Sequence, residues 1–228
     1  MSLFKVDKVS FISNTTSIIN GISLEIEKGT TTALLGRSGG GKSTLLKLIA
    51  GILVPSSGHV YFNGTDTGQM SEEQNMAFRR RCSFVFQDSA LWANQDILQN
   101  LSLPLQIHYP EMSAFDRKFT VQSICAMVNY TRSLSLRPAD LSTGEQKRIA
   151  FARAMVCGPE VLFLDECTES LDTKGTGTLV NLLHNFLAQG NTIIYVSHNS
   201  AFIKEFPGTI YIIDDGHIKQ TTEPGEAV

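Results

Sequence analysis

The sequence of 228 residues predicts an α/β protein in which a helical segment is inserted into a parallel-sheet core. Three observations support this fold class. The short apolar runs 161–164 and 192–196 lack polar alternation, as strands do when helices cover both faces of a sheet. A glycine-rich turn separates a strand-like run from a helical one after residue 35. From about residue 88 to residue 157, strand signals give way to helical ones.

The composition is that of an ordinary globular chain. Apolar residues make up 42% and charged residues 18%, without a low-complexity tract, so the chain should fold. Its length suits one domain, or a core with an inserted subdomain. The net charge of -3 gives no general attraction to nucleic acid, so we expect no nucleic-acid partner.

Cysteine spacing and hydropathy indicate the compartment. The four cysteines lie far apart without a CxxC pair, which argues against a disulfide framework and against a zinc site. We expect reduced thiols in the cytoplasm. No apolar run reaches the roughly 18 residues of a spanning helix, and the N-terminus lacks a signal-peptide hydrophobic region. Any role at a membrane is therefore expected to be peripheral.

The first third of the chain is predicted to form strands around one helix. Apolar and polar residues alternate over 21–28, which is the pattern of a half-buried strand. The run 30–35 predicts a buried strand, and 42–50 has helical composition. Two shorter strands are predicted on either side of a polar stretch at 63–80, namely 58–62 and 83–86.

The rest of the chain is predicted to contain both helices and strands. Helices are predicted at 114–128 and 144–155, followed by strands at 161–164 and 192–196. The runs 209–213 and 217–219 flank Asp215-Gly216, a strong signal for a β-hairpin.

The strongest motif is a phosphate-binding loop at residues 36–43. It matches G-x-x-x-x-G-K-[ST] and stands between a strand and a helix, a context that disfavours a chance glycine turn. Backbone N–H groups of such a loop converge on phosphates at the helix N-terminus. Lys42 supplies charge to the outer phosphates and Ser43 a hydroxyl ligand for Mg²⁺. We predict a P-loop NTPase core that binds ATP through Gly36, Arg37, Ser38, Gly39, Gly40, Gly41, Lys42, Ser43 and Thr44.

Two carboxylates follow the apolar run 161–164. Acidic residues after a buried strand often only begin a solvated loop, so Asp165 and Glu166 alone indicate little. Beside a phosphate-binding loop both can act in nucleotide hydrolysis, because that reaction needs one carboxylate at the metal ion and another near the γ-phosphate. Asp165 can hold Mg²⁺ through water, and Glu166 can polarise the attacking water as a general base.

The segment 141–146, Leu-Ser-Thr-Gly-Glu-Gln, resembles the signature motif of the ABC transporter ATPases. Ser142 and Glu145 also form an S-x-x-E capping box, which independently predicts a helix start. A capped helix without further function is the alternative interpretation of this segment alone. The resemblance implies that Ser142, Thr143, Gly144 and Glu145 face the γ-phosphate of ATP bound to a second subunit.

Further elements of the ABC family appear in the expected order, so that the resemblance covers residues from about 4 to 220. Gln87 resembles the glutamine that touches Mg²⁺ and the attacking water. Residues 169–172 resemble the D-loop, through Ser170 and Asp172, and His198 resembles the switch histidine that contacts the γ-phosphate. The implied catalytic residues are Glu166, His198 and Gln87, and the implied metal ligands are Ser43, Gln87 and Asp165.

The resemblance implies a P-loop NTPase core with an antiparallel β subdomain and an inserted α-helical subdomain. We expect one ATPase domain over 1–228, with its core at about 1–87 and 158–228 and the helical subdomain at about 88–157. The implied cofactors are ATP and Mg²⁺.

The resemblance also implies a function. Two copies would close on ATP to energise a separate integral membrane permease, from the cytoplasmic face of the cell membrane. A soluble ABC ATPase that drives a non-membrane process is the alternative, although tandem domains, long coiled-coil insertions and basic linkers, which are usual there, are not visible.

Three positions depart from the family pattern. Ser13 stands where an aromatic residue usually stacks on adenine, and Phe11 should face the same side as Ser13 by strand alternation. We therefore expect modest discrimination between ATP and GTP. Thr143 replaces a glycine of the signature, and Cys167 replaces a proline and is expected to be a buried, inert thiol. Hydrolysis is still expected, since no chemical group is lost.

The segment 88–105 is expected to contact the membrane partner. It follows Gln87 and holds the only tryptophan, Trp92, for which burial in the core is an equally weighted alternative. Together with 137–140, this segment resembles importer-type and lipid-trafficking ATPases more than fused exporters.

Overall fold

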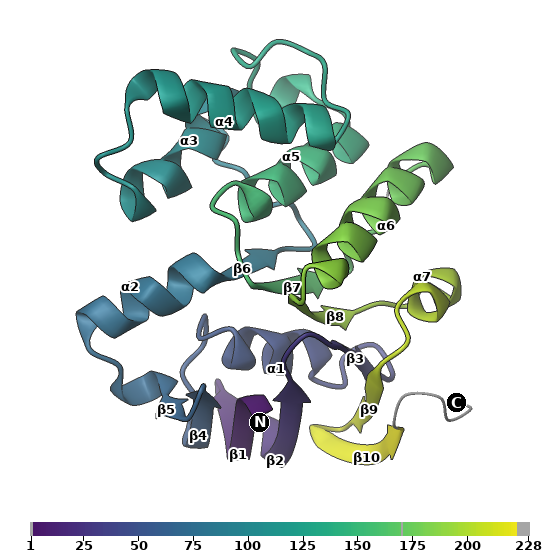
Figure 1. The fold of residues 1–228 in the computed structure, drawn as a ribbon. Coiled ribbons are helices and arrows are strands. Elements are labelled where there is room, and N and C mark those ends of the chain that lie inside the picture. The colour runs from purple at the N-terminus through teal and green to yellow at the C-terminus, as the bar shows by residue number, and fades with distance from the viewer. Residues whose placement is uncertain (1, 170, 223–228) are drawn as a thin grey trace.

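The computed structural model describes residues 2–169 and 171–222 and has a mixed six-stranded sheet at its centre (Figure 1). The strand order is β10-β9-β3-β8-β7-β6. All neighbours are parallel except β9 and β10, so the carboxyl ends of five strands meet at one edge. The strands are β3 (Thr31–Leu35), β6 (Cys82–Val85), β7 (Val161–Asp165), β8 (Thr192–Val196), β9 (Thr209–Asp214) and β10 (His217–Thr222).

A second, antiparallel sheet has the order β2-β1-β4-β5. Its long strands β1 and β2 pair from Ser2 with Glu27 to Ser13 with Thr16. The alternation seen in the sequence over 21–28 is real, because Ile22, Leu24 and Ile26 are buried. The strands are β1 (Ser2–Ser13), β2 (Thr16–Glu27), β4 (Ser57–Phe62) and β5 (Thr65–Asp66).

Two hydrophobic cores lie on opposite faces of the mixed sheet. Along β7, Leu162 and Leu164 belong to one core, while Val161 and Phe163 belong to the other. Helix α1 (Lys42–Ile49) contributes to the second core and lies between the two sheets (Figure 1). Burial on both faces explains why β7 and β8 read as continuous apolar runs.

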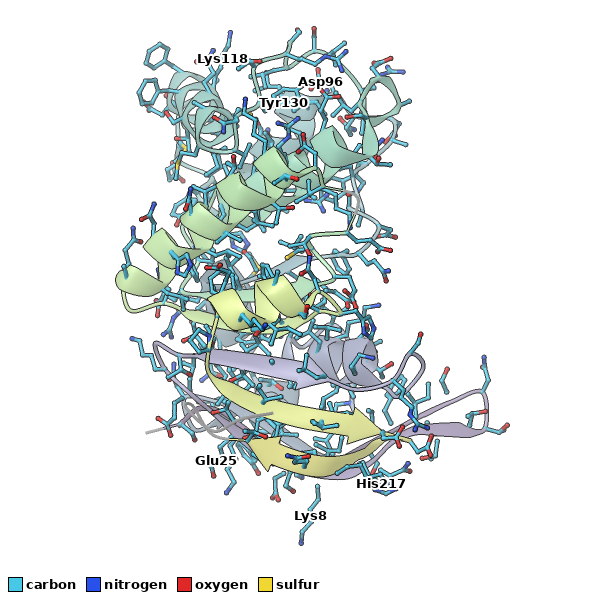
Figure 2. All side chains as sticks on the ribbon, turned by 90° about the vertical axis from the view of Figure 1, so that its right-hand side faces the viewer. Lys8, Glu25, Asp96, Lys118, Tyr130 and His217 are labelled. Atoms are coloured by element: carbon cyan, nitrogen blue, oxygen red, sulfur yellow. The ribbon has the colours of Figure 1, made fainter. Side chains whose placement is uncertain are left out.

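The other core is covered by helices, most of which are inserted between β6 and β7. These are α3 (Ile97–His108), α4 (Ala114–Met127) and α5 (Thr143–Met155), with a short 3-10 turn, η2 (Pro138–Asp140). Figure 2 shows Lys118 and Tyr130 at the opposite end of the molecule from Lys8 and Glu25. The predicted helical insertion therefore forms one end of the fold. After β7 follow α6 (Thr173–Ala188) and, beyond β8, α7 (Ser200–Glu205).

The polar stretch 63–80 contains a helix that the sequence pattern did not predict. After β5 and the turn η1 (Thr67–Gln69), helix α2 spans Glu72–Arg81. Ser71 and Gln74 cap it reciprocally, and basic residues fill its last turn. Its only buried side chain is Phe78, so no apolar periodicity marks it. None of the helices in the described residues has the length and apolar composition needed to span a bilayer.

The predicted C-terminal hairpin is present and reaches the phosphate loop. Asp215 and Gly216 both have positive φ, as a two-residue turn of this kind requires. The N–H of Gly216 donates to the carbonyl of Gly40 at 3.3 Å, and the N–H of Asn20 donates to the carbonyl of Gly216 at 2.9 Å. The turn therefore joins the phosphate loop to β2.

Candidate functional site

The phosphate loop connects β3 to α1 at the carboxyl edge of the mixed sheet. Helix α1 begins at Lys42, and its N-cap, Gly41, has a φ of 98° and no side-chain cap. The first N–H groups of this helix are thus left for an anion, supported by the helix dipole. Loop residues that line the adjacent cleft are Ser38, Gly39, Gly41, Lys42, Ser43 and Thr44.

Gly36 and Gly40 do not line the cleft as most of the other loop residues do, but pack against β9. Gly36 has a φ of 135°, and a Cβ there would lie less than 3.0 Å from the carbonyl oxygen of Ile213. A Cβ on Gly40 would lie 3.1 Å from the same oxygen. The absence of side chains at these two positions lets the loop sit against the sheet.

Lys42 is buried at the bottom of the cleft, with 5% of its surface exposed. Its ammonium donates to the carbonyl of Arg37 within the loop at 2.6 Å. Burial lowers the pKa of Lys42, and the carboxylates Glu166 and Asp165 oppose that shift. The ammonium is therefore held beside the position that the loop offers to phosphate.

The side chains of Ser43 and Asp165, each with an oxygen atom that can bind a metal ion, lie together beside Lys42. The Ser43 hydroxyl donates to Oδ1 of Asp165 at 2.8 Å. Asp165 ends β7 and is 3% exposed. A hydroxyl and a carboxylate placed together beside a phosphate-binding loop are ligands that Mg²⁺ accepts.

Glu166 and His198 meet across the ends of β7 and β8. Nε2 of His198 lies 3.3 Å from Oε1 of Glu166, and the N–H of His198 donates to Oε2 at 3.2 Å. Glu166 has a φ of 48°, a left-handed conformation that is uncommon without glycine. This conformation turns its side chain into the cleft, where both residues lie with the phosphate loop.

Gln87 follows β6 and lines the same cleft. Its amide donates to Oε2 of Glu169 at 2.9 Å. Asp172, from the D-loop, instead caps helix α6 by accepting from the N–H of Gly175 at 2.7 Å. Ser170 lies outside the described residues, so the prediction for it stays a prediction.

The cleft has a volume of about 710 Å³, within the usual range for small-ligand sites. It brings together residues from segments 18–44, 87, 166–169 and 196–199. Among the described residues, those of the signature segment 142–145 do not line it.

The signature segment begins helix α5. Ser142 is its N-cap and forms the predicted capping box with Glu145. Hydrogen bonding from the Ser142 backbone N–H lowers the pKa of the Glu145 carboxyl, and Arg132 adds to this at 3.1 Å. The charge of Glu145 is therefore balanced by a cation that the sequence pattern did not single out. Thr143 is the first helical residue and is exposed.

Phe11 and Ser13 are both half-buried and the Ile12 between them is exposed, so the burial of β1 alternates here as expected. Register shifts flank Phe11 in the pairing of β1 with β2, and Phe11 packs against the second core. Neither Phe11 nor Ser13 lines the cleft in the described residues, whereas Ile18 of β2 does. An aliphatic side chain thus occupies the edge of the cleft beside Gly41.

Two further expectations concern single residues. Cys167 is 4% exposed, and burial raises its pKa to about 12, which agrees with an inert thiol. Trp92 is 43% exposed, so the interpretation as a core tryptophan was wrong.

A parallel sheet with a glycine loop, a buried lysine and carboxylates at its carboxyl edge defines the class of P-loop nucleotide-binding proteins. The chain belongs to the ABC transporter family, whose sequence model matches residues 19–169.

Relatives and solved structures agree with this assignment. The chain is 33% identical over 207 residues to "Methionine import ATP-binding protein MetN 2" of Paraburkholderia xenovorans (strain LB400). This alignment covers 90% of this chain and 53% of that protein. It is 35% identical over 201 residues to the protein of the same name from Burkholderia mallei (strain ATCC 23344), covering 88% and 50%. The chain therefore spans about half the length of these relatives.

Among solved structures, the ATP-binding cassette MJ0796, in a dimeric post-hydrolysis state with ADP and Pi, superposes with a TM-score of 0.90 at 27% identity. The match covers 96% of this chain and 98% of that one. CbiO1 from Clostridium perfringens, described as part of the ABC transporter complex cbiONQ, gives 0.79 at 28% identity, covering 98% and 89%.

Proposed function

We propose that this chain is the ATP-binding and ATP-hydrolysing subunit of an ABC transporter, which energises a separate membrane permease by closure of a dimer on ATP. The observation that carries the proposal is the meeting of Lys42, Gln87, Glu166 and His198 in one cleft at the sheet edge. The family assignment and the dimeric cassette structure support it. We assign one ATPase domain to 1–228, with a core at 1–87 and 158–228 and a helical subdomain at 88–157.

Each cleft residue has a role in this proposal. The phosphate loop holds the triphosphate through its N–H groups, and Lys42 neutralises charge on the outer phosphates. Glu166 accepts a proton from the attacking water, and His198 orients Glu166 and contacts the γ-phosphate. The 3.3 Å contact between these two side chains supports their joint action. Gln87, which lines the same cleft, positions the same water.

The donors beside Lys42 also fit Mg²⁺. In residues 2–169 and 171–222, no three His, Cys, Asp or Glu side chains gather as a metal-binding cluster. An ion here would therefore be coordinated by Ser43, by Gln87 and, through water, by Asp165. Nucleotide oxygens would complete its coordination, as is common for Mg²⁺. When bound, the ion would neutralise charge on the phosphate oxygens.

The signature helix is proposed to complete the site of a second copy. Residues 142–145 lie away from the cleft of their own chain, yet their helix start can face an anion. Pairing of Glu145 with Arg132 reduces the repulsion that a lone carboxylate would exert on a γ-phosphate. The name of one solved structure, a dimeric bacterial ABC transporter cassette, supports this arrangement for a related protein.

Base selectivity is expected to be weak. Ile18 offers apolar surface to either purine but no ring to stack on, and it makes no hydrogen bond that would distinguish their edges. Dissociation constants for ATP and GTP should agree within about tenfold in competition binding. Ile18→Ala should weaken both to the same degree. A strong preference of the unchanged protein for ATP would contradict the prediction.

The permease is proposed to dock beside Gln87. A groove of about 460 Å³ runs between α2, β6 and the helical insertion, lined by Phe84, Phe86, Trp92, Arg79 and Arg153 among others. Trp92 is exposed and Phe84 and Phe86 are half-buried, and aromatic side chains with flanking arginines are typical of interface anchors. We propose that the subunit docks in this way on the cytoplasmic face of the membrane, and the similarity to methionine import ATP-binding proteins supports an importer-type subunit.

The test is co-purification with integral membrane permease subunits from membranes of the source cells. A tagged chain should retain them, and Trp92→Ala should reduce the retained amount at least about tenfold without weakening ATP binding. Phe115→Ala is the matched control, because Phe115 is an exposed aromatic residue on α4, 78% exposed and outside the groove. Hydrolysis without any permease association would favour the alternative, a soluble ABC ATPase.

A further inference from the structure

Helix α5 carries a buried lysine that the proposed function does not use. Lys147 lies in the second turn of the helix and is 7% exposed. A buried ammonium is costly unless its N–H groups find acceptors. Its acceptors are two backbone carbonyls: that of Gln87 and, at 3.4 Å, that of Glu166.

These carbonyls belong to the two segments that carry the proposed catalytic side chains. Gln87 follows β6 and Glu166 follows β7, and β6 and β7 are adjacent parallel strands. Lys147 therefore bridges the ends of neighbouring strands from the helix that covers them. Glu166 is held with a φ of 48°, a conformation that persists only where surrounding contacts stabilise it.

Arg153, further along the same helix, holds the rest of the segment after Gln87. Its guanidinium donates to the carbonyls of Ala90 at 2.7 Å and Ser89 at 3.1 Å, and lies 5.0 Å from the centre of the Trp92 ring. Ser89 and Ala90 also have positive φ, at 65° and 45°. Two cations of one helix thus hold the backbone from Gln87 to Trp92 in an unusual conformation.

The same helix begins with the signature residues. Ser142 is its N-cap, its first turn holds Glu145, its second turn holds Lys147, and Arg153 lies near its end. A helix transmits displacement along its axis as a rigid element. Any movement of the signature face is therefore carried to Gln87 and Glu166 by the hydrogen bonds of Lys147. It is carried to the groove by the hydrogen bond of Arg153 to Ala90 and by its contact with the Trp92 ring.

We propose that Lys147 is a positioning residue that ties Gln87 and the backbone of Glu166 to the signature helix, so that closure of the signature face sets the catalytic carboxylate and the groove together. This inference rests on the proposed ATPase function. It predicts that removal of the ammonium uncouples the signature helix, the catalytic carboxylate and the groove from one another. No group that touches the nucleotide is removed.

The test is the variant Lys147→Met, which keeps the length and apolar stem of the side chain. We expect kcat for ATP hydrolysis to fall about 10- to 100-fold with KM and the ATP dissociation constant unchanged, because the nucleotide still binds but Glu166 and Gln87 are misplaced. Trp92 is the only tryptophan, so its fluorescence reports on the groove directly. We expect ATP and magnesium to change Trp92 emission in the unchanged protein, and Lys147→Met should lose this change.

The control is Lys118→Met, the same chemical change at an exposed position on α4. It should match the unchanged protein in all assays. The proposal requires both the lower kcat and the lost fluorescence response, so wild-type values of either in Lys147→Met overturn it. Trp92 emission that ignores nucleotide in the unchanged protein would overturn it too.

Two further outcomes are separable. If circular dichroism shows that Lys147→Met does not fold, Lys147→Gln, which keeps one N–H donor, enters the same assays under the same criteria. If the unchanged protein binds ATP but never hydrolyses it, the proposed function fails. If it hydrolyses ATP and the variants do so equally well, only the role of Lys147 fails.

Discussion

Glu166→Gln is expected to bind ATP and magnesium with near-normal affinity while hydrolysis falls by about three orders of magnitude or more. The amide is isosteric with the carboxylate and can still approach His198, but it cannot accept the proton of the attacking water. The triphosphate then stays intact and continues to hold two copies together. Size-exclusion chromatography in ATP and magnesium should show a dimer, and a monomer without nucleotide.

The chain offers a matched control for this variant. Glu205 also pairs with a histidine, His184, at 3.3 Å, on the surface formed by α6 and α7. Glu205→Gln therefore makes the same chemical change in a similar pair outside the cleft, and it should leave hydrolysis unchanged. Retained hydrolysis in Glu166→Gln would remove this residue from the role of general base. A monomer at saturating ATP would argue against closure as a dimer.

Gly36→Ala is expected to abolish nucleotide binding and to destabilise the fold by at least about 2 kcal/mol, because strain and overpacking act together. The φ of 135° is one that only glycine adopts readily, and the added Cβ would lie less than 3.0 Å from the carbonyl oxygen of Ile213. That oxygen belongs to β9, which cannot move without disturbing the sheet. Chemical denaturation and ATP titration of the same sample measure both effects.

Gly177→Ala serves as the comparison. Gly177 lies inside α6, without positive φ, and a Cβ there would meet no atom within 4 Å. Alanine is the better helix former, so this variant should gain up to about 1 kcal/mol in unfolding free energy and keep full ATP binding. Equal binding by Gly36→Ala and the unchanged protein would show that the loop tolerates a side chain at its first position.

Much of the fold could be predicted because burial leaves a direct trace in the sequence. Strands β3, β7 and β8 are apolar on both faces, and each was predicted to within one or two residues. The hairpin around Asp215-Gly216 was predicted from its turn residues alone. Helix α2 was missed for the converse reason, since Phe78 is its only buried residue and polar helices have no periodic apolar stripe.

Glu166 was predicted from its place after a buried strand beside a phosphate-binding loop, whereas Gln87 and His198 were predicted only from the resemblance to the ABC family. All three follow predicted strands, and parallel strands bring their carboxyl ends to one edge. Ile18 could not be found in this way, because an isoleucine in an apolar strand looks like any core residue. Phe11 and Ser13 keep the expected alternation of burial, yet neither lines the cleft, and strand alternation gives no means of predicting that.

Lys147 and Arg132 were missed for another reason. A lysine or arginine usually lies in solvent, and only the tertiary packing shows that Lys147 is enclosed and that Arg132 reaches Glu145. Their partners are backbone carbonyls and a carboxylate on distant segments. No local sequence pattern predicts such tertiary contacts.

The contact between the turn at Gly216 and the phosphate loop at Gly40 has a consequence for the order of assembly. The two segments are far apart along the chain, and the loop gains this backbone partner only when the hairpin of β9 and β10 has formed. During synthesis the ribosome must therefore release the chain through residue 216 before this contact can form. We expect a nascent chain to acquire nucleotide only after the hairpin has emerged.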